Sequence, residues 1–171
     1  MDPLTQGIVG AALPQAFSRE KHVALATVLG FLSGMAADLD IFIRSDSDPL
    51  LFLEYHRQFT HSLVFIPLGG ALCGLLFYFA IGCRNDISFF RIYFYCTAGY
   101  ATHAILDACT TYGTLLWWPF NEERVAWNLV SVIDPLFTLP IVIFVLLGLA
   151  KKTRRYAFLC LAWVFVYLSL G

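Results

Sequence analysis

Charged side chains are scarce in this sequence. Only 13% of its 171 residues are Asp, Glu, Lys or Arg, whereas 59% are hydrophobic. Soluble domains carry about 25% charged and about 45–50% apolar residues. A soluble fold of this size has too little interior to hide so much apolar surface, so we expect lipid to surround much of the chain. The net charge of −1 gives no reason to expect nucleic acid as a partner.

Other common signals are also lacking. The five cysteines show no CxxC spacing and lie mostly in apolar runs, so we interpret them as packing residues. No basic region precedes the first apolar stretch, so we expect no cleavable signal peptide. There is no internal repeat and no low-complexity tract. We therefore expect one integral-membrane domain over residues 1–171. The sequence ends inside an apolar segment, which leaves open whether the last span is truncated.

Long apolar segments are what the sequence does have. Leu63–Cys83 reaches the roughly 20 residues that a spanning helix needs. Two shorter segments near the start are rich in Gly and Ala, which lets helices approach closely. We interpret these two as a tight helical hairpin turned by residues 18–22. The prediction is an all-α, polytopic transmembrane helical bundle of about five to six membrane segments, drawn from Leu4–Phe17, Val23–Ala37, Leu63–Cys83, Phe89–Leu106, Val130–Ala150 and Tyr156–Gly171.

The basic residues predict an orientation. If the segments span alternately, three short loops on one side hold eight of the eleven Lys and Arg residues, namely Arg19, Lys21, Arg84, Arg91, Lys151, Lys152, Arg154 and Arg155. Loops rich in Lys and Arg stay in the cytoplasm. The opposite side receives most of the acids and three of the four histidines. The His/Asp residues should therefore gather at the non-cytoplasmic face of a multi-pass protein.

Three pairs of residues at that face predict a metal site. Asp38 and Asp40 end an apolar helix. His103 and Asp107 are four residues apart and so share one helical face. His56 and His61 converge only if His56 lies in the loop, and Thr60 is placed to cap the next helix with His61 in its first turn. Imidazole suits zinc and other first-row metals. Taken singly, each pair also fits interfacial residues without a ligand.

Further polar residues surround these pairs. Arg57 is suited to holding an anionic oxygen. Asp134 lies about one turn into a span, where a carboxylate is functional by default, as a further ligand, a general base or a partner of Arg57 or Arg124. Thr5 and Gln6 fall at the same face. The segment Trp117–Arg124 fits either an aromatic belt or contact with a substrate head group, and Asp46 and Asp48 fit solvated loop charges.

The blocks MDPLTQGIVGAA, DLDIF, HRQFTHSLVF, HAILDACTTYGT, WPFNEERVAWN and VIDPLFTLP occur in this order over about residues 1–140. In this they resemble the LexA-regulated inner-membrane family of bacteria whose members are described as metal-dependent hydrolases. That family is thought to be distantly related to zinc-dependent phospholipases C and single-strand nucleases. The resemblance implies a ligand set of Asp38, Asp40, His56, His61, His103 and Asp107, with Asp134 close by. Some relatives carry histidine where this chain has Gln6, and many have a longer C-terminal part.

We therefore expect a membrane-embedded hydrolase of the bacterial inner membrane with its metal site facing the periplasm. The six ligands would hold one or two divalent ions, zinc first by ligand type, while Arg57 and Asp134 would serve catalysis. The expected substrate is a lipid or another phosphoester, with membrane lipid as a partner and no nucleic acid. Two alternatives remain: a metal or ion transporter or metal-responsive protein that uses the same cluster, and a purely structural membrane protein.

Overall fold

The computed structural model describes residues 1–43, 56–83 and 85–171, so Asp46 and Asp48 lie outside the described residues. The described part is all-helical, as predicted, and contains no strand beyond two isolated bridges. The longer helices are α1 (Pro3–Phe17), α2 (Val23–Met35), α4 (Ile66–Phe77), α5 (Phe89–Ala108), α6 (Pro135–Ala150) and α7 (Arg155–Leu170). Short helical segments join them: η1 (Glu20–His22), η2 (Ala36–Phe42), η3 (Phe59–His61) and η4 (Tyr78–Gly82).

The helices α1 and α6 begin with the same local sequence signal. An aspartate cap is followed by proline in α1 (Asp2-Pro3) and again in α6 (Asp134-Pro135). The Thr5 amide donates to Asp2 over 3.0 Å, and the Phe137 amide donates to Asp134 over 3.1 Å. Each carboxylate satisfies an amide that has no partner inside its helix, and the proline needs no such partner. The sequence therefore sets both helix starts locally.

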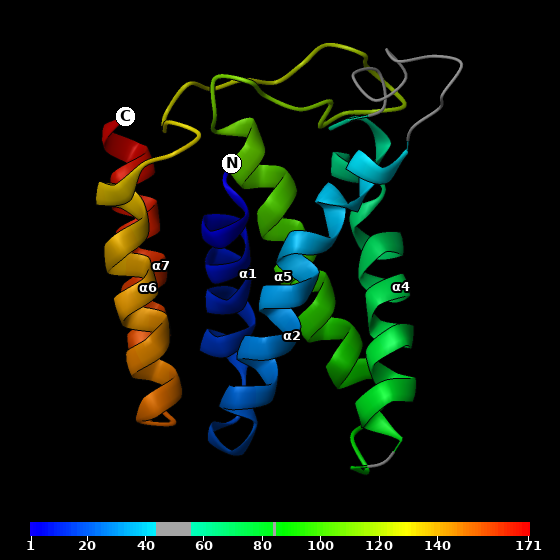
Figure 1. Cartoon of the computed structure of the whole chain (residues 1–171), viewed down its shortest axis with the longest axis vertical. Helices are drawn as coiled ribbons and strands as arrows, with labels where there is room; N and C mark the ends of the chain where they lie inside the picture. The colour runs from blue at the N-terminus through cyan, green and yellow to red at the C-terminus, as the bar shows by residue number, and fades with distance from the viewer. Residues whose placement is uncertain (44–55, 84) are drawn as a thin grey trace.

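The helices run alternately up and down, side by side (Figure 1). The N-terminus, η2 and the loop that follows α5 lie at one end of the bundle. The connections α1–α2, α4–α5 and α6–α7 lie at the other end. This is the alternation that the sequence predicted, and it brings residues from distant parts of the chain to the end where the His/Asp pairs lie.

Glycines set the distance between α1, α2 and α5. A Cβ atom added at Gly30 would lie 2.4 Å from the Gly10 carbonyl oxygen and 2.3 Å from Pro14 Cγ, and one added at Gly99 would lie 2.4 Å from the Gly30 oxygen. Neither position leaves room for a side chain. The predicted close approach of the first two helices is confirmed, and α5 joins them at the same crossing.

The expectation of five to six spans is not matched by helix length. Among the residues that the structure describes, one helix is long and apolar enough to cross a membrane, Glu20–Phe42, with 23 residues and a mean hydropathy of 1.5. Ile66–Gly82, Pro135–Ala150 and Arg155–Leu170 are shorter apolar helices. A helix of 16 residues is about 24 Å long, against about 30 Å of hydrocarbon. α5 is longer, but Arg91, His103 and Asp107 interrupt its apolar character.

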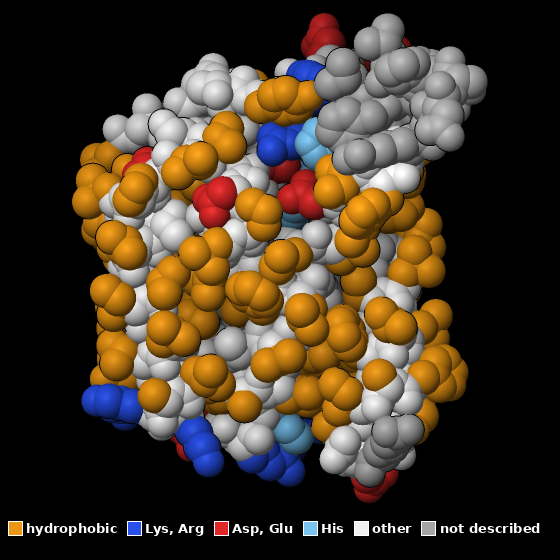
Figure 2. Space-filling view, viewed as in Figure 1, with side chains coloured by type: hydrophobic (Ala, Val, Ile, Leu, Met, Phe, Trp, Pro, Cys, Tyr) orange, Lys and Arg blue, Asp and Glu red, His pale blue; other side chains and the backbone are white. Residues whose placement is uncertain are grey.

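The outer surface nevertheless carries an apolar belt. In Figure 2 hydrophobic side chains cover the middle of the visible face, and charged and histidine side chains lie towards its two ends, with Lys and Arg prominent at the lower one. Large side chains on several helices are more than two fifths exposed, among them Leu72 and Leu76 on α4, Phe79 on η4, Leu146 on α6 and Phe165 on α7. Soluble monomers rarely expose so large an apolar area.

Candidate metal centre

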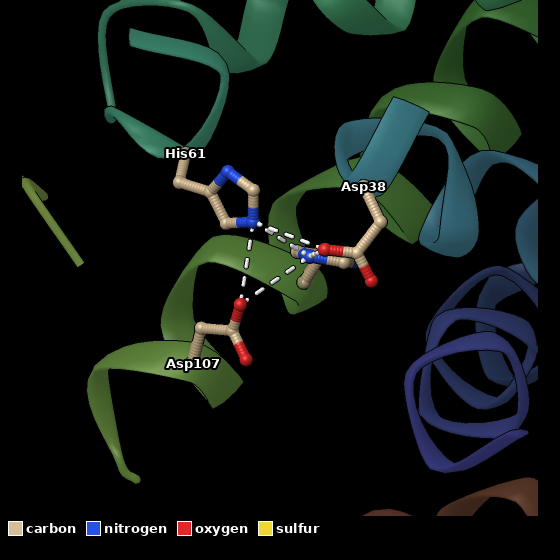
Figure 3. Close-up of side chains that lie close together, drawn as sticks. Asp38, His61 and Asp107 are labelled. Atoms are coloured by element: carbon tan, nitrogen blue, oxygen red, sulfur yellow. Dashed lines mark hydrogen bonds and ion pairs between the residues drawn. The ribbon is translucent and has the colours of Figure 1, made fainter. Parts of the chain in front are cut away.

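Four side chains from three separate segments meet at the end of the bundle that carries the N-terminus. Asp38 comes from η2, His61 from η3, and His103 and Asp107 from successive turns of α5. Figure 3 shows Asp38, His61 and Asp107 pointing toward one another. His61, His103 and Asp107 are fully buried, while the Asp38 side chain keeps 22% of its surface exposed. We call these four residues the four-residue site.

The atoms of the four-residue site fit the corners of a small tetrahedron. The two imidazole Nε2 atoms are 2.9 Å apart. Asp38 Oδ1 lies 3.6 and 3.4 Å from them, and Asp107 Oδ2 lies 3.3 and 3.4 Å from them. Four ligands placed about 2.0–2.1 Å from one zinc ion would be separated by about 3.3–3.4 Å. The side chains present therefore fit a single tetrahedral ion in both ligand type and spacing.

Neighbouring groups fix which nitrogen of each histidine faces the centre. His103 Nδ1 lies 2.5 Å from the Gly34 carbonyl oxygen, which can only accept, so Nδ1 carries the proton and Nε2 is left for a metal. Thr60 Oγ donates to Asp40 over 2.7 Å and therefore accepts from His61 Nδ1, 2.9 Å away. Both rings thus have the tautomer that metal binding needs.

Asp107 is held through one oxygen and leaves the other for the centre. Oδ1 accepts from Gln6 Nε2 over 2.7 Å and from the Met1 amino group. Oδ2 is buried and has no hydrogen-bond partner among the described residues. A buried carboxylate oxygen without a donor is costly unless a cation neutralises it. Gln6, which the sequence placed at this face, therefore helps to orient the Asp107 carboxylate.

Asp40 and His56 lie beside the four-residue site. His56 Nδ1 is 2.8 Å from Asp40 Oδ1, while Asp40 Oδ2 accepts from the Arg57 amide over 3.1 Å and lies 3.4 Å from His61 Nδ1. Asp38, Asp40 and His56 form a second group that is close enough to hold an ion, and Asp38 is common to both groups. The predicted six ligands therefore divide into four at one centre and two at its edge.

The electrostatics of the cluster favour positive charge. Burial disfavours a charged imidazole at His61, but hydrogen bonds to Asp107, Asp38 and Asp40 outweigh burial and raise its pKa to about 10. Without a metal, a proton would hold these carboxylates together. A divalent ion would replace that proton, so its binding should release protons.

Arg57 brings a buried guanidinium to the edge of the site. Its Nε lies 3.3 Å from Asp107 Oδ2, yet Nε and Nη1 have no hydrogen-bond partner among the described residues. Its Cζ lies 4.7 Å from the centroid of the Tyr112 ring, and Arg124 Cζ lies 5.0 Å from the same centroid. His56, Arg57, Tyr112 and Val132 line a cavity of about 170 Å³. An anion there would supply the acceptors that Arg57 lacks.

The backbone of Arg57 is fixed in an unusual conformation. Its φ of 60° lies in the left-handed region, which residues other than glycine seldom adopt. Its carbonyl oxygen accepts from the Leu115 amide over 3.2 Å and from Thr114 Oγ over 3.1 Å. Hydrogen bonds from the loop after α5 therefore hold the Arg57 backbone beside the site. Neither the role of Tyr112 nor these hydrogen bonds could be predicted from the sequence, because both depend on contacts between distant segments.

Two predicted residues are not brought into the cluster. Asp134 caps α6 and accepts from Tyr167 Oη over 2.8 Å, so neither contact joins it to the four-residue site. Thr5 Oγ bonds to Asp2 over 2.6 Å and to Thr138 over 2.7 Å. A capping carboxylate and a catalytic one look alike in sequence, and the structure gives Asp134 the capping contacts.

The local prediction for His61 also needs correction. Thr60 does not cap the next helix, because its hydroxyl bonds to Asp40, and α4 begins only at Ile66. His61 instead ends the short segment η3, whose Ser62 Oγ donates to the Phe59 carbonyl. His61 therefore reaches His103 from η3, a short turn that precedes α4, and not from the first turn of α4.

Comparison with known proteins gives one match. The family model described as YdjM inner membrane protein matches residues 1–171, the whole chain. No curated protein and no solved structure matches it. The inner-membrane location that the resemblance implied is therefore confirmed at the level of the family, and the matched description names no chemistry.

Proposed function

Because the chain belongs to the YdjM inner membrane protein family, we propose that it is a multi-pass, metal-dependent hydrolase of the bacterial inner membrane. Its site faces the periplasm and acts on a phosphoester or lipid. The observation that carries this proposal is the four-residue site, in which two Nε2 atoms and two carboxylate oxygens face one buried centre. Expression under LexA control, which the resemblance also implies, stays a prediction.

The donor set favours zinc. Two imidazoles and two carboxylates are common zinc ligands, and the single tetrahedral centre suits an ion without a geometric preference of its own. We propose one ion, bound by Asp38, His61, His103 and Asp107. The lone pairs of Asp40 are already used by His56, Thr60 and the Arg57 amide, so Asp40 and His56 orient the site, and a second ion there is the alternative.

The chain's own residues divide the remaining work. A zinc ion bound there would polarise a substrate oxygen and lower the pKa of a water molecule. Asp38 is the most exposed of the four ligands and marks the side from which substrate arrives. Arg57 would bind the anionic oxygens of a phosphoester in the cavity beside Tyr112 and stabilise negative charge that develops there. The loop after α5 keeps Arg57 in position.

Elemental analysis of the detergent-purified protein tests the proposal. We expect about one equivalent of zinc in the wild type and none in His61→Ala/Asp107→Ala. His22→Ala is the matched control, since His22 lies at the opposite, basic end of the bundle beside Arg91 and should retain the metal. Size-exclusion profiles show whether each variant remains folded, and His61→Gln provides a milder variant.

The outcomes separate the alternatives. A metal-containing wild type that hydrolyses a chromogenic phosphodiester, with both properties lost in the double variant, supports the hydrolase. Two equivalents would show that Asp38, Asp40 and His56 hold a second ion. A wild type that contains no metal and takes up none after dialysis against zinc overturns the metal mechanism and favours the structural alternative. Metal flux into liposomes without hydrolysis would favour transport.

A further inference from the structure

A second cavity, of about 290 Å³, opens on the outer surface next to the four-residue site. Leu39 of η2 and Leu72 of α4 form its outer walls, and Phe65 and Tyr100 lie deeper in it. Its lining is apolar apart from Asp40, Thr60 and the Tyr100 hydroxyl, which donates to the Thr60 carbonyl over 2.8 Å. We call this cavity the η2–α4 groove.

The η2–α4 groove is lined at one end by residues that contact the metal centre. Thr60 and Asp40 line it and both approach His61 Nδ1, at 2.9 and 3.4 Å. At its other end, Leu39 is 60% exposed and Leu72 is 57% exposed, and both belong to the apolar surface of the bundle. The groove therefore leads from the apolar outer surface of the bundle to Thr60 and Asp40, the residues that orient His61.

We propose that the η2–α4 groove binds an acyl chain of a membrane phospholipid, so that the substrate of the site is a lipid phosphoester that enters sideways between η2 and α4. The choice of substrate rests on the proposed function, whereas the binding of the chain does not. An acyl chain has no polar groups to satisfy, while a peptide or sugar in this groove would bury donors and acceptors without partners.

The polar end of such a lipid also has a counterpart. The Arg57 amide donates to Asp40 Oδ2, so Asp40 stands between the groove and the cavity that holds the Arg57 guanidinium. Arg57 Nε and Nη1 have no hydrogen-bond partner among the described residues, as a phosphate-binding group would before its ligand arrives. A chain in the groove and a phosphate at Arg57 would place the head group of the lipid near Asp40, beside the four-residue site.

Photo-crosslinking in nanodiscs tests chain binding directly. The wild type is placed in phosphatidylethanolamine and phosphatidylglycerol containing a trace of phosphatidylglycerol with a diazirine in its acyl chain, and adducts are mapped by mass spectrometry. We expect adducts to concentrate on Leu39, Phe65 and Leu72. Leu72→Trp should lower the yield of these adducts roughly tenfold, because the larger side chain would occupy space that the acyl chain needs, and inserting extra volume at an occupied site is unfavourable. Leu76→Trp, also on α4, exposed and outside the groove, is the matched control.

Metal content and hydrolysis are measured on the same samples. Leu72→Trp should retain its metal and still hydrolyse a short, water-soluble phosphodiester, while its turnover of the phospholipid falls. Leu39→Trp repeats the test from the opposite wall and guards against misfolding of one variant. Adducts spread evenly over the belt and unchanged by either substitution would overturn the proposal. Concentrated adducts on a protein that binds no metal would support the groove and refute the hydrolase.

Discussion

Asp107 and Asp40 are both buried carboxylates near His61, but their contacts predict different roles. Asp107 directs at the centre an oxygen that accepts no hydrogen bond from the described residues, whereas Asp40 is hydrogen-bonded on both oxygens. We expect Asp107→Asn to abolish zinc binding. Asp40→Asn should retain one ion and weaken its affinity roughly 10–100-fold, the usual effect of losing a residue that orients a ligand. Competition with a chelator of known affinity measures both.

Asp134→Asn serves as the control for these two substitutions, because it changes a carboxylate at the same end of the bundle without touching the cluster. It should leave zinc affinity unchanged while slightly destabilising the protein, since it weakens the bond from Tyr167. Complete loss of zinc in Asp40→Asn would show that Asp40 is itself a ligand and that the four-residue site is incomplete.

Arg57 carries the prediction for catalysis. Arg57→Gln removes the guanidinium and keeps a polar side chain, so the metal should remain bound while kcat on a phosphodiester falls roughly 10²–10³-fold, as when a charge-stabilising donor is lost. Arg124→Gln, the neighbour across Tyr112, should lower kcat less, because Arg124 is mostly exposed. Equal activity of Arg57→Gln and wild type would exclude contact between Arg57 and the reacting phosphate.

The residue scale also shows how far the sequence reaches. The His103/Asp107 pair was predictable because both residues share one face of one helix, and the two meet at the centre. The different roles of Asp38 and Asp40 could not be predicted. Asp40 orients His61 because its carboxylate accepts hydrogen bonds from Thr60 and the Arg57 amide, and these contacts are not visible in the sequence. The contacts of Asp134 could not be predicted for the same reason, since one of them comes from Tyr167 on a different helix.

At the scale of helices, the close glycine contacts between α1, α2 and α5 keep the parts of the four-residue site in register. Gly34 of α2 supplies the carbonyl that orients His103 of α5, so the spacing of these helices sets the geometry of a candidate ligand. Gly30→Ala would place a methyl 2.4 Å from the Gly10 oxygen and separate the helices. We expect a loss of about 1–3 kcal/mol in stability and weaker zinc binding, measured by thermal unfolding and chelator competition.

Val28→Ala is the matched control for Gly30→Ala. Val28 lies on the same helix but is 47% exposed on its outer side, so its truncation should leave zinc affinity and the unfolding temperature nearly unchanged. If Gly30→Ala unfolded at the wild-type temperature and kept its zinc, the close crossing would not be needed to position His103.

The helices themselves were partly predictable. Composition alone indicated the glycine-rich hairpin. The Asp-Pro dipeptides begin two helices, α1 and α6, whereas the sequence predicted Asp134 about one turn inside a span. The beginning of α4 was placed three residues too early, because apolar residues continue through the turns that precede it. The number of spans was also beyond the sequence, since apolar runs such as residues 130–150 include loop residues before their helix begins.

At the scale of the whole molecule, the distribution of basic residues predicts how the bundle is oriented in the membrane. At one end of the bundle, the connections and the first turns of the helices that follow them hold seven of the described basic residues: Arg19, Lys21, Arg91, Lys151, Lys152, Arg154 and Arg155. Lys21, Lys151 and Arg155 are exposed. The four-residue site lies at the other end. Since basic loops stay in the cytoplasm, the proposed multi-pass topology places the site at the periplasmic face and requires α5 to cross the membrane.

Cysteine labelling tests this orientation. Cys83 is an exposed native cysteine in the connection between α4 and α5, whereas Cys96, Cys109 and Cys160 are buried. Asn121→Cys adds an exposed thiol in the loop after α5, at the end that carries the four-residue site. In cells with a permeabilised outer membrane and an intact inner membrane, a membrane-impermeant maleimide should label Asn121→Cys and leave Cys83 unlabelled until the inner membrane is opened. Labelling of both thiols from outside would mean that the chain between them crosses an even number of times. Such a result would leave α5 lying on the membrane and remove the argument for a site reached from the periplasm.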